Sequence, residues 1–186
     1  MNMDLQGNSP QTLLNRFQTV RKISQDLTEP LLPEDQVIQS MPDASPIKWH
    51  LAHTSWFFET FVLLPFRSGY SAFHPKYSVL FNSYYQGVGE QYPRDQRGLL
   101  TRPTLDEVYR YREVIDRELT QLLADTDHPD VKTIRQRVEL GLQHEQQHQE
   151  LILTDVKHLL SHNPVAPAYD GDAMTPDAAP LPLAFL

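Results

Sequence analysis

The sequence contains no cysteine, which excludes disulfide bonds, thiolate metal ligands and cysteine nucleophiles. It also contains no long apolar run, and Met1–Pro10 has neither a basic start nor an apolar core. We therefore expect no membrane span and no signal peptide. Basic residues are in deficit, and the net charge of -8 argues against a nucleic-acid partner. These absences predict a cytoplasmic protein in which histidines or carboxylates must hold any metal.

What the sequence does contain is helical periodicity without any strand signal. Four segments repeat apolar residues three and four positions apart, and prolines or capping patterns mark their ends. They are residues 10–30, 47–64, 104–122 and 129–163. This pattern predicts an all-α fold, a four-helix bundle over residues 1–163. Residues 65–103 form a long irregular connection between the second and third helices, with a short helix expected at 79–86. Residues 164–186 are expected to be a proline-rich linker or tail.

Three histidines form a candidate metal site. His144 and His148 are four residues apart, so they project from one face of the last helix and can share one ion. His53 lies on the aromatic face of the second helix, where a buried imidazole needs a polar partner or a metal. The two faces can meet in a bundle, and three imidazoles suit Fe(II), Zn, Cu or Ni. Alternatively, these are exposed or core histidines with ordinary hydrogen-bond partners.

The same segment matches the H-E-x-x-H pattern of zinc metallopeptidases, in which Glu145 would be the general base. We discount this interpretation because nothing between His148 and the tail supplies an evident third ligand. Gly141, one turn before His144, either leaves space near the site or marks a close contact between helices.

Four motifs in the same order resemble the N-terminal DinB-like domain of hercynine oxygenases, the nonheme iron sulfoxide synthases of ergothioneine biosynthesis. The motifs are IKWHLAHTSWFFE at 47–59, FNSYYQGVG at 81–89, RGLLTRP at 97–103 and HEQQHQE at 144–150. The resemblance covers most of residues 10–165. It implies that His53, His144 and His148 bind Fe(II). It also implies a reaction in which O2 joins a thiol, cysteine or gamma-glutamylcysteine, to hercynine (N-alpha-trimethylhistidine) as a sulfoxide.

The resemblance assigns roles to further residues. Gln147 would hydrogen-bond the substrate ring, and Tyr84 and Tyr85 match a tyrosine pair beside the iron that can donate a proton or hydrogen. Arg94 matches an anchor for the carboxylate of the thiol, and Arg97 can complete a clamp with it. From residue chemistry alone, adjacent tyrosines are more often core residues, and the arginines are as often solvated charges.

Family members carry a second, C-terminal domain that resembles the formylglycine-generating enzyme and supplies part of the hercynine site. This sequence shows no such domain, and the proline-rich tail lies about where it would begin, so we expect that domain to act as a partner. Trp49 and Trp56 could hold a trimethylammonium group by cation–π contact, although core packing is the commoner role. Two alternatives stay open: a DinB-like thiol S-transferase that uses Zn or Ni to lower the pKa of a thiol, and a non-catalytic metal-binding module.

Overall fold

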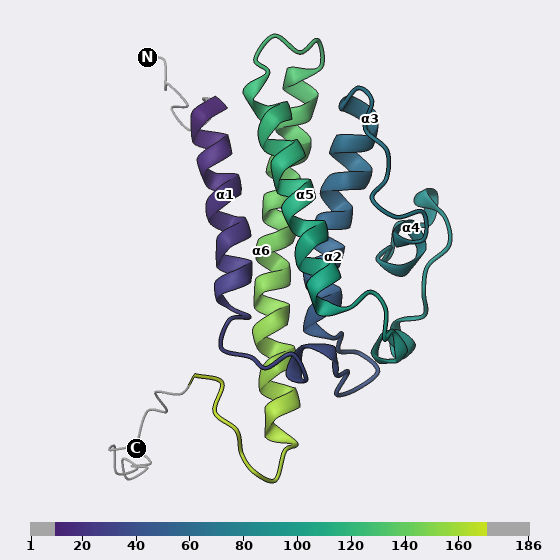
Figure 1. The fold of residues 1–186 in the computed structure, drawn as a ribbon, viewed down its shortest axis with the longest axis vertical. Helices are drawn as coiled ribbons and strands as arrows, with labels where there is room; N and C mark the ends of the chain where they lie inside the picture. The colour runs from purple at the N-terminus through teal and green to yellow at the C-terminus, as the bar shows by residue number, and fades with distance from the viewer. Residues whose placement is uncertain (1–9, 171–186) are drawn as a thin grey trace, which may run out of the picture.

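The computed structural model describes residues 10–170, where the chain folds into a bundle of long helices without strands (Figure 1). The long helices are α1 (Pro10–Asp26), α2 (Ile47–Phe58), α5 (Leu105–Ala124) and α6 (Val131–Ser161). α2 packs against both α5 and α6, and α1 packs against the same two helices. The predicted all-α four-helix bundle is therefore confirmed. No helix in the described part of the chain is both long enough and apolar enough to cross a bilayer.

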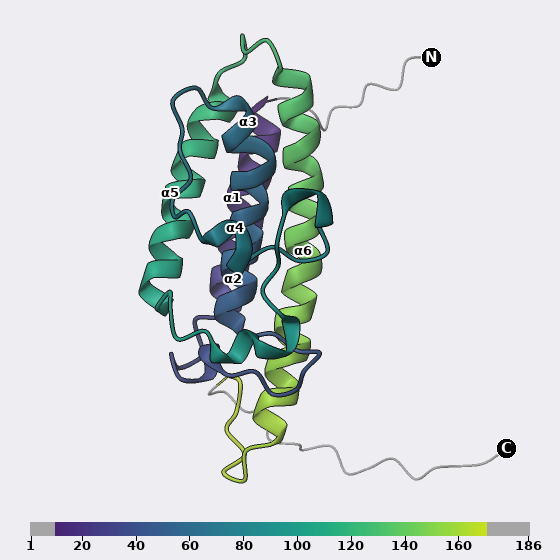
Figure 2. The same cartoon turned by 90° about the vertical axis from the view of Figure 1, so that its right-hand side faces the viewer.

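α2 is the central element of the fold. Every residue from Ile47 to Phe58 is buried, because α5, α6 and the following connection cover it from several sides (Figure 2). A helix that is enclosed in this way is apolar or aromatic around most of its circumference. α5 instead buries one stripe, formed by Val108, Tyr111, Ile115, Leu119 and Leu122, which follows the predicted spacing. It begins with the predicted capping box, in which the Glu107 backbone N–H donates to Thr104 Oγ1 at 3.2 Å.

The second helix continues past the proline that was expected to end it. After α2 the chain makes a π-helical turn, η2 (Glu59–Leu63), and a further helical turn, α3 (Leu64–Phe66), which contains Pro65. Proline has no N–H to donate to the preceding turn. The carbonyl of Phe61 instead accepts a hydrogen bond from Arg137 of α6 at 2.8 Å. A side chain from another helix therefore replaces the missing backbone donor.

The carboxylate of Glu59 anchors the start of the long connection. It accepts hydrogen bonds from the Tyr70 hydroxyl at 2.7 Å, the Phe73 backbone N–H at 2.8 Å and the Tyr111 hydroxyl at 2.6 Å. Burial, followed by the effect of Glu59, raises the pKa of both tyrosines. Both phenols therefore stay protonated and remain hydrogen-bond donors, which fixes the connection to α2 and α5.

The connection contains three short helical segments, α4 (Tyr77–Leu80), η3 (Gln86–Val88) and η4 (Arg94–Leu99). The short helix predicted at 79–86 is wrong, because the α-helix starts earlier and ends at Leu80. Two α2 side chains take the carbonyls at that end: Trp49 Nε1 donates to Leu80 at 3.0 Å, and a ring nitrogen of His53 donates to Phe81 at 2.6 Å. Soon after, Tyr84 adopts a left-handed backbone conformation with φ 63°. These bonds hold the connection against α2, on the side seen in Figure 2 between α5 and α6.

The segment after α6 is described only in part. Residues 164–170 form no helix, and the Tyr169 hydroxyl donates to the carbonyl of Leu27 at 2.6 Å. The rest of the predicted tail, 171–186, lies outside the described residues, as does Ser9 in the start signal of the first helix.

Candidate metal centre

The three candidate histidines converge between α2 and α6. One nitrogen from each of His53, His144 and His148 lies within 4.8 Å of the others. The helix spacing explains this, because His144 and His148 occupy successive turns of one face of α6. The His53 ring is fixed between two indoles, with centroid distances of 4.5 Å to Trp49 and 5.4 Å to Trp56 and nearly parallel planes. The arrangement can bind a metal ion.

The hydrogen bonds around His53 leave a ring lone pair directed at this cluster. A carbonyl oxygen only accepts, so His53 Nδ1 carries the proton donated to Phe81. In the neutral ring Nε2 is then unprotonated, and it lies 3.1 Å from His144 Nε2. The other nitrogen of His144, Nδ1, is buried without a hydrogen-bond partner in the described part of the chain. The Nε2 atoms of His53 and His144 are close enough either to share a proton or to coordinate one cation. The donor set therefore fits a metal.

The protonation state of the cluster also favours metal binding. Burial lowers the pKa of His144 to about 4, against an opposing effect of Glu145. Burial, then the neighbouring histidines, also lower the pKa of His53 and His148. An imidazole must be neutral to coordinate a metal. All three rings are therefore in the ligand form at neutral pH.

These histidines lie in a cavity of about 300 Å³ that α2, α6 and the long connection enclose. The cavity wall includes all eight site residues that the sequence suggested: His53, Tyr84, Tyr85, Arg94, Arg97, His144, Gln147 and His148. The structure thus brings together residues that are up to 95 positions apart in the chain (148 - 53 = 95). It shows where they lie, while the roles of the tyrosines, arginines and glutamine remain predictions.

The two arginines give this cavity a positive wall. Arg97 is buried, and its guanidinium lies 3.4 Å from the centroid of the Trp49 ring. Burial first, and then the charge of Arg94, lower the pKa of Arg97 to about 10, so it remains a cation at neutral pH. Within residues 10–170, the acceptors that the two guanidinium groups reach are all neutral: the hydroxyls of Ser45, Ser83 and Tyr84 and the carbonyl of Asp43. The positive charge of this wall is therefore available to an anionic ligand.

The two tyrosines differ in their surroundings. Tyr84 is 77% exposed, and its hydroxyl accepts a hydrogen bond from Arg94 at 2.7 Å. Tyr85 is half-buried against Trp56, Phe57 and Phe61, and burial raises the pKa of its phenol. Tyr85 is therefore a protonated phenol on the cavity wall, and Tyr84 lies at its exposed rim.

The tryptophans are core residues, as the commoner interpretation holds. Trp56 is 0% exposed. Trp49 carries Arg97 against its ring and stacks on His53. The indole faces are occupied by protein groups, so a ligand's trimethylammonium group has no access to them.

Glu145 faces away from the cavity. Its carboxylate is 0% exposed and accepts hydrogen bonds from Ser24 at 2.7 Å and from Arg21 and Arg112 at 3.0 Å each. Burial alone would raise the pKa of Glu145, but the two guanidinium groups outweigh it and the pKa is lowered. A carboxylate engaged in this way cannot act as a general base at the metal. The metallopeptidase interpretation therefore fails, although His53 does lie beside the pair as a candidate third ligand.

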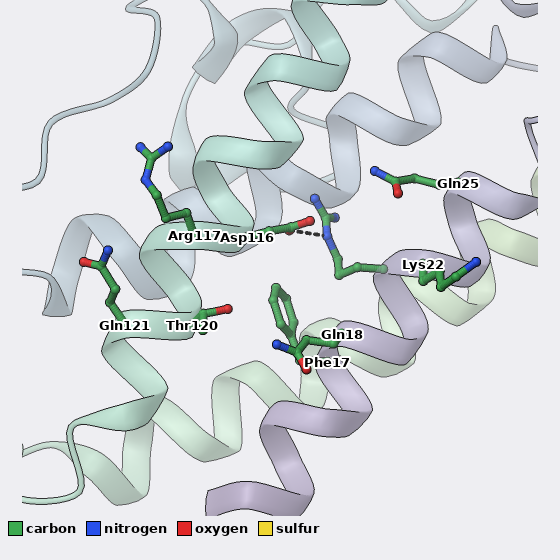
Figure 3. A pocket seen from close by; sticks show the side chains of 9 residues that line it. Phe17, Gln18, Lys22, Gln25, Asp116, Arg117, Thr120 and Gln121 are labelled. Carbon is green, nitrogen blue, oxygen red and sulfur yellow. Dashed lines mark hydrogen bonds and ion pairs between the residues drawn. The ribbon is translucent and has the colours of Figure 1, made fainter.

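Glu145, Arg21, Arg112 and Asp116 form a largely buried charge cluster. Arg21 and Asp116 lie at its outer end, beneath a surface hollow of about 470 Å³ between α1 and α5 (Figure 3). There Arg21 Nε donates to Asp116 Oδ1 at 2.6 Å. Figure 3 shows Asp116 beside Phe17, with polar side chains such as Gln18 and Thr120 around the rim. The cluster therefore links α1, α5 and α6 on the side of α6 opposite the histidines.

Gly141 marks a close helix contact. A Cβ atom at this position would lie 2.3 Å from Cε1 of Phe58. The glycine allows α6 to approach the buried ring of α2 one turn before His144. Of the two interpretations offered by the sequence, the contact between helices is the one the structure shows.

Sequence reasoning missed the groups behind His148. His50 is buried, and its Nδ1 lies 2.8 Å from His148 Nδ1. Asp155, which the motifs did not single out, lies 3.0 Å from His50 Nε2. The available signal was spacing, because His148 and Asp155 are seven residues apart, two turns along one face of α6.

Comparison with known proteins identifies the fold family. The family model of the DinB superfamily matches residues 16–152, which include the three histidines and the whole connection. No curated protein matches the chain.

Proposed function

This chain belongs to the DinB superfamily, and from that premise we propose that it is the iron-binding part of a sulfoxide synthase that joins a thiol to hercynine. Its three histidines hold Fe(II), and the cavity beside them takes the thiol. The observation that carries the proposal is that three neutral imidazoles line the same cavity as two arginines, whose acceptors among the described residues are all neutral. A metal-binding thiol that also carries a carboxylate, such as cysteine or gamma-glutamylcysteine, satisfies both sets of groups.

The residues of the cavity then divide the work as follows. His53, His144 and His148 would hold the ion and leave coordination positions for ligands. Fe(II) bound there would activate O2, and the four electrons that reduce O2 would come from the two substrates, two from C–S bond formation and two from oxidation of sulfur. Arg97 and Arg94 bind the carboxylate of the thiol, since guanidinium groups pair with carboxylates in a planar two-point geometry. Arg97 is the more rigid of the two, because its ring contact and two serines already position it.

Two polar groups remain for the second substrate and for proton transfer. The amide of Gln147 is exposed on the cavity wall and can hydrogen-bond an imidazole ring. Tyr85 keeps its proton, and its hydroxyl would serve as a proton donor on the cavity wall while O2 is reduced. In the overall reaction one C–H and one S–H bond are lost, a C–S bond forms, one oxygen atom of O2 ends on sulfur and the other leaves as water.

The four sequence motifs at 47–59, 81–89, 97–103 and 144–150 support the choice of this reaction among those open to a three-histidine site. The trimethylammonium group of hercynine needs residues other than Trp49 and Trp56, whose faces are covered. We propose that a second domain of the formylglycine-generating-enzyme type supplies them, since in the family that the motifs resemble such a domain supplies part of the hercynine site.

A thiol S-transferase is the second candidate, and it rests on the donor set. Three imidazoles bind Zn or Ni as readily as Fe(II), and a divalent cation lowers the pKa of a bound thiol. Such an enzyme would use the same arginine wall but would need no O2. A module that binds metal without binding thiols is the third possibility.

The first experiment tests the site itself. Anaerobic protein is loaded with Fe(II), and metal content is measured for the wild type and for His53→Ala. We expect about one iron per chain in the wild type and a loss of most of it in the variant. Nitric oxide then serves as a probe, and we expect cysteine to perturb the spectrum of the nitrosyl complex at lower concentration than cysteamine, which lacks the carboxylate. Equal concentrations for the two thiols, or no iron bound, would sink the proposal.

A second experiment separates the candidate reactions. The iron-loaded chain, mixed with a formylglycine-generating-enzyme-like domain from a sulfoxide synthase, should consume O2 only when hercynine and the thiol are both present. Conjugation of the thiol to an electrophile by Zn-loaded protein, with no O2 uptake, would instead identify the transferase. Binding of metal without any effect of thiols would leave the metal-binding module.

A further inference from the structure

A hydrogen-bonded chain lies directly behind His148, on the side away from the cluster. His148 Nδ1 is 2.8 Å from His50 Nδ1, and His50 Nε2 is 3.0 Å from Asp155 Oδ2. The backbone N–H of Ser45 also donates to Asp155 Oδ2, at 2.9 Å. His50 comes from α2, and the other two side chains come from α6, so the chain crosses between helices and returns.

From this geometry we propose that His50 and Asp155 are positioning residues that fix the tautomer of His148, so that only its Nε2 can coordinate a divalent metal. The inference rests on the proposed metal site and assigns two further residues to it. Neither would touch the metal or a substrate.

The direction of each hydrogen bond follows from the Asp155 end. Oδ2 already accepts from the Ser45 N–H, and a carboxylate oxygen can only accept, so His50 must donate from Nε2. The Nδ1 atoms of His50 and His148 lie 2.8 Å apart, so a single proton lies between the two rings. His50 is 3% exposed and already donates from Nε2 to the carboxylate, so with one proton on each ring its Nδ1 is the acceptor and His148 donates from Nδ1. This leaves Nε2 of His148 unprotonated, as coordination of a metal through that atom requires.

The same device acts on His53 with a different partner. There the carbonyl of Phe81 accepts the Nδ1 proton and leaves Nε2 free. In two of the three proposed ligands, a hydrogen bond at Nδ1 therefore fixes the tautomer. The partner of His53 is a backbone carbonyl, and the partner of His148 is the His50–Asp155 pair. Hydrogen bonds of this kind orient a ligand imidazole and raise its basicity, and their loss typically lowers metal affinity by about 10–100-fold.

The hydrogen-bonded series His148–His50–Asp155 also connects to the positive wall of the cavity through Ser45. Ser45 donates its backbone N–H to Asp155, and its hydroxyl accepts from Arg97 at 2.9 Å. One residue therefore fixes both the carboxylate behind the metal ligand and the arginine proposed to bind the anion.

The first test measures the affinity of the full chain for Zn(II), by competition with a chelating dye. Asp155→Ala removes the acceptor, so His50 and His148 can exchange tautomers and the affinity should fall about 10–100-fold. Asp155→Asn keeps an oxygen acceptor and should bind closer to the wild type. Glu150→Ala is the matched control, because it removes an exposed carboxylate from the same helix and should leave the affinity unchanged. Equal losses for Asp155→Ala and Glu150→Ala would show a general charge effect and overturn the proposal.

The second test reads the tautomers without any metal. Long-range ¹H–¹⁵N correlation spectra of histidine-labelled protein distinguish Nδ1–H from Nε2–H rings. We expect His148 as the Nδ1–H form and His50 as the Nε2–H form in the wild type. A wild-type His148 protonated at Nε2 would overturn the proposal even if Asp155→Ala did not fold. If the tautomers are as expected but the wild type binds no metal, the proposed function fails while the hydrogen-bonded chain stands.

Discussion

Replacing Glu145 by glutamine should lower the free energy of unfolding by about 3–5 kcal/mol, the range for removing one partner from a buried ion pair. The amide keeps the shape of the side chain and one acceptor oxygen, so the main loss is the negative charge. Arg112 is 0% exposed, and its other acceptors are two carbonyls and the hydroxyl of Thr54, all neutral. Arg21 retains Asp116 as a counter-charge. The substitution therefore leaves one guanidinium buried without compensation.

This loss is large for a chain of 186 residues. Domains of this size are stable by about 5–15 kcal/mol in total, and each kcal/mol lost lowers the melting temperature by about 2–4 °C. Glu145→Gln should accordingly melt about 6–20 °C below the wild type.

Glu139→Gln provides a matched control. Glu139 lies on the same helix and also pairs with an arginine of α1, Arg16, through two hydrogen bonds of 2.7 and 2.8 Å. The side chains of this pair are 36% and 41% exposed. Ion pairs at the surface contribute about 0–1 kcal/mol, so the control should melt within a few degrees of the wild type.

The assay is urea and thermal unfolding of the two variants followed by circular dichroism, together with Zn(II) binding to the folded protein. We expect Glu145→Gln to keep its metal affinity, because the carboxylate faces away from the cavity. If the free energies of unfolding of Glu145→Gln and Glu139→Gln differ by less than about 1 kcal/mol, the buried cluster stabilises the bundle no more than a surface ion pair does. A stable variant that lost only a metal-dependent hydrolytic activity would revive the peptidase interpretation.

Three further predictions concern local packing and capping. Gly141→Ala should lower the free energy of unfolding measured by urea titration. Overpacking against the enclosed Phe58 ring costs about 1–3 kcal/mol, whereas the gain in helix propensity is only about 1 kcal/mol. Gly87→Ala is the control, because the space around Gly87 is open, and it should leave the free energy of unfolding unchanged. Thr104→Ala should cost about 1 kcal/mol at pH 7 through loss of the cap on α5, measured in the same way. Hydrogen bonds from the backbone and then the side chain of Thr104 lower the pKa of Glu107. The part of the stabilisation that depends on ionised Glu107 is therefore present above the ordinary glutamate pKa of about 4.3 and is lost as pH falls below it. The difference between Thr104→Ala and wild type should therefore shrink at pH 3, and a difference that grew there would contradict the assignment.

Much of the fold followed from local patterns. The spacing of apolar residues located the four long helices, and the Thr104–Glu107 pattern gave the start of α5 directly. The errors arose where a side chain distant in sequence replaced a local hydrogen bond. Pro65 did not end its helix because Arg137 satisfies the exposed carbonyl. The short helix expected at 79–86 ends at Leu80 because α2 side chains take the neighbouring carbonyls.

The candidate metal ligands could be predicted for the same reason as the helices. A spacing of four places His144 and His148 on one face, and a histidine on an aromatic face of another helix needs a polar partner. What supports them could not be predicted so readily. The arginine that pairs with Glu145 from α1 lies 124 positions away in the chain, and no short pattern reports a contact of that length.

The clamp on Glu145 has a consequence for how the protein handles its ion. Glu145 follows His144 directly but points to the other side of α6, where residues of α1 and α5 hold it. These contacts fix the rotation of α6 about its own axis, and therefore the direction in which the imidazoles of His144 and His148 point. They form whether or not an ion is bound. In zinc fingers the ion organises the chain, and its removal unfolds the domain. Here the bundle would stay folded when the metal ion is removed. One preparation of the protein could therefore bind different metals in turn.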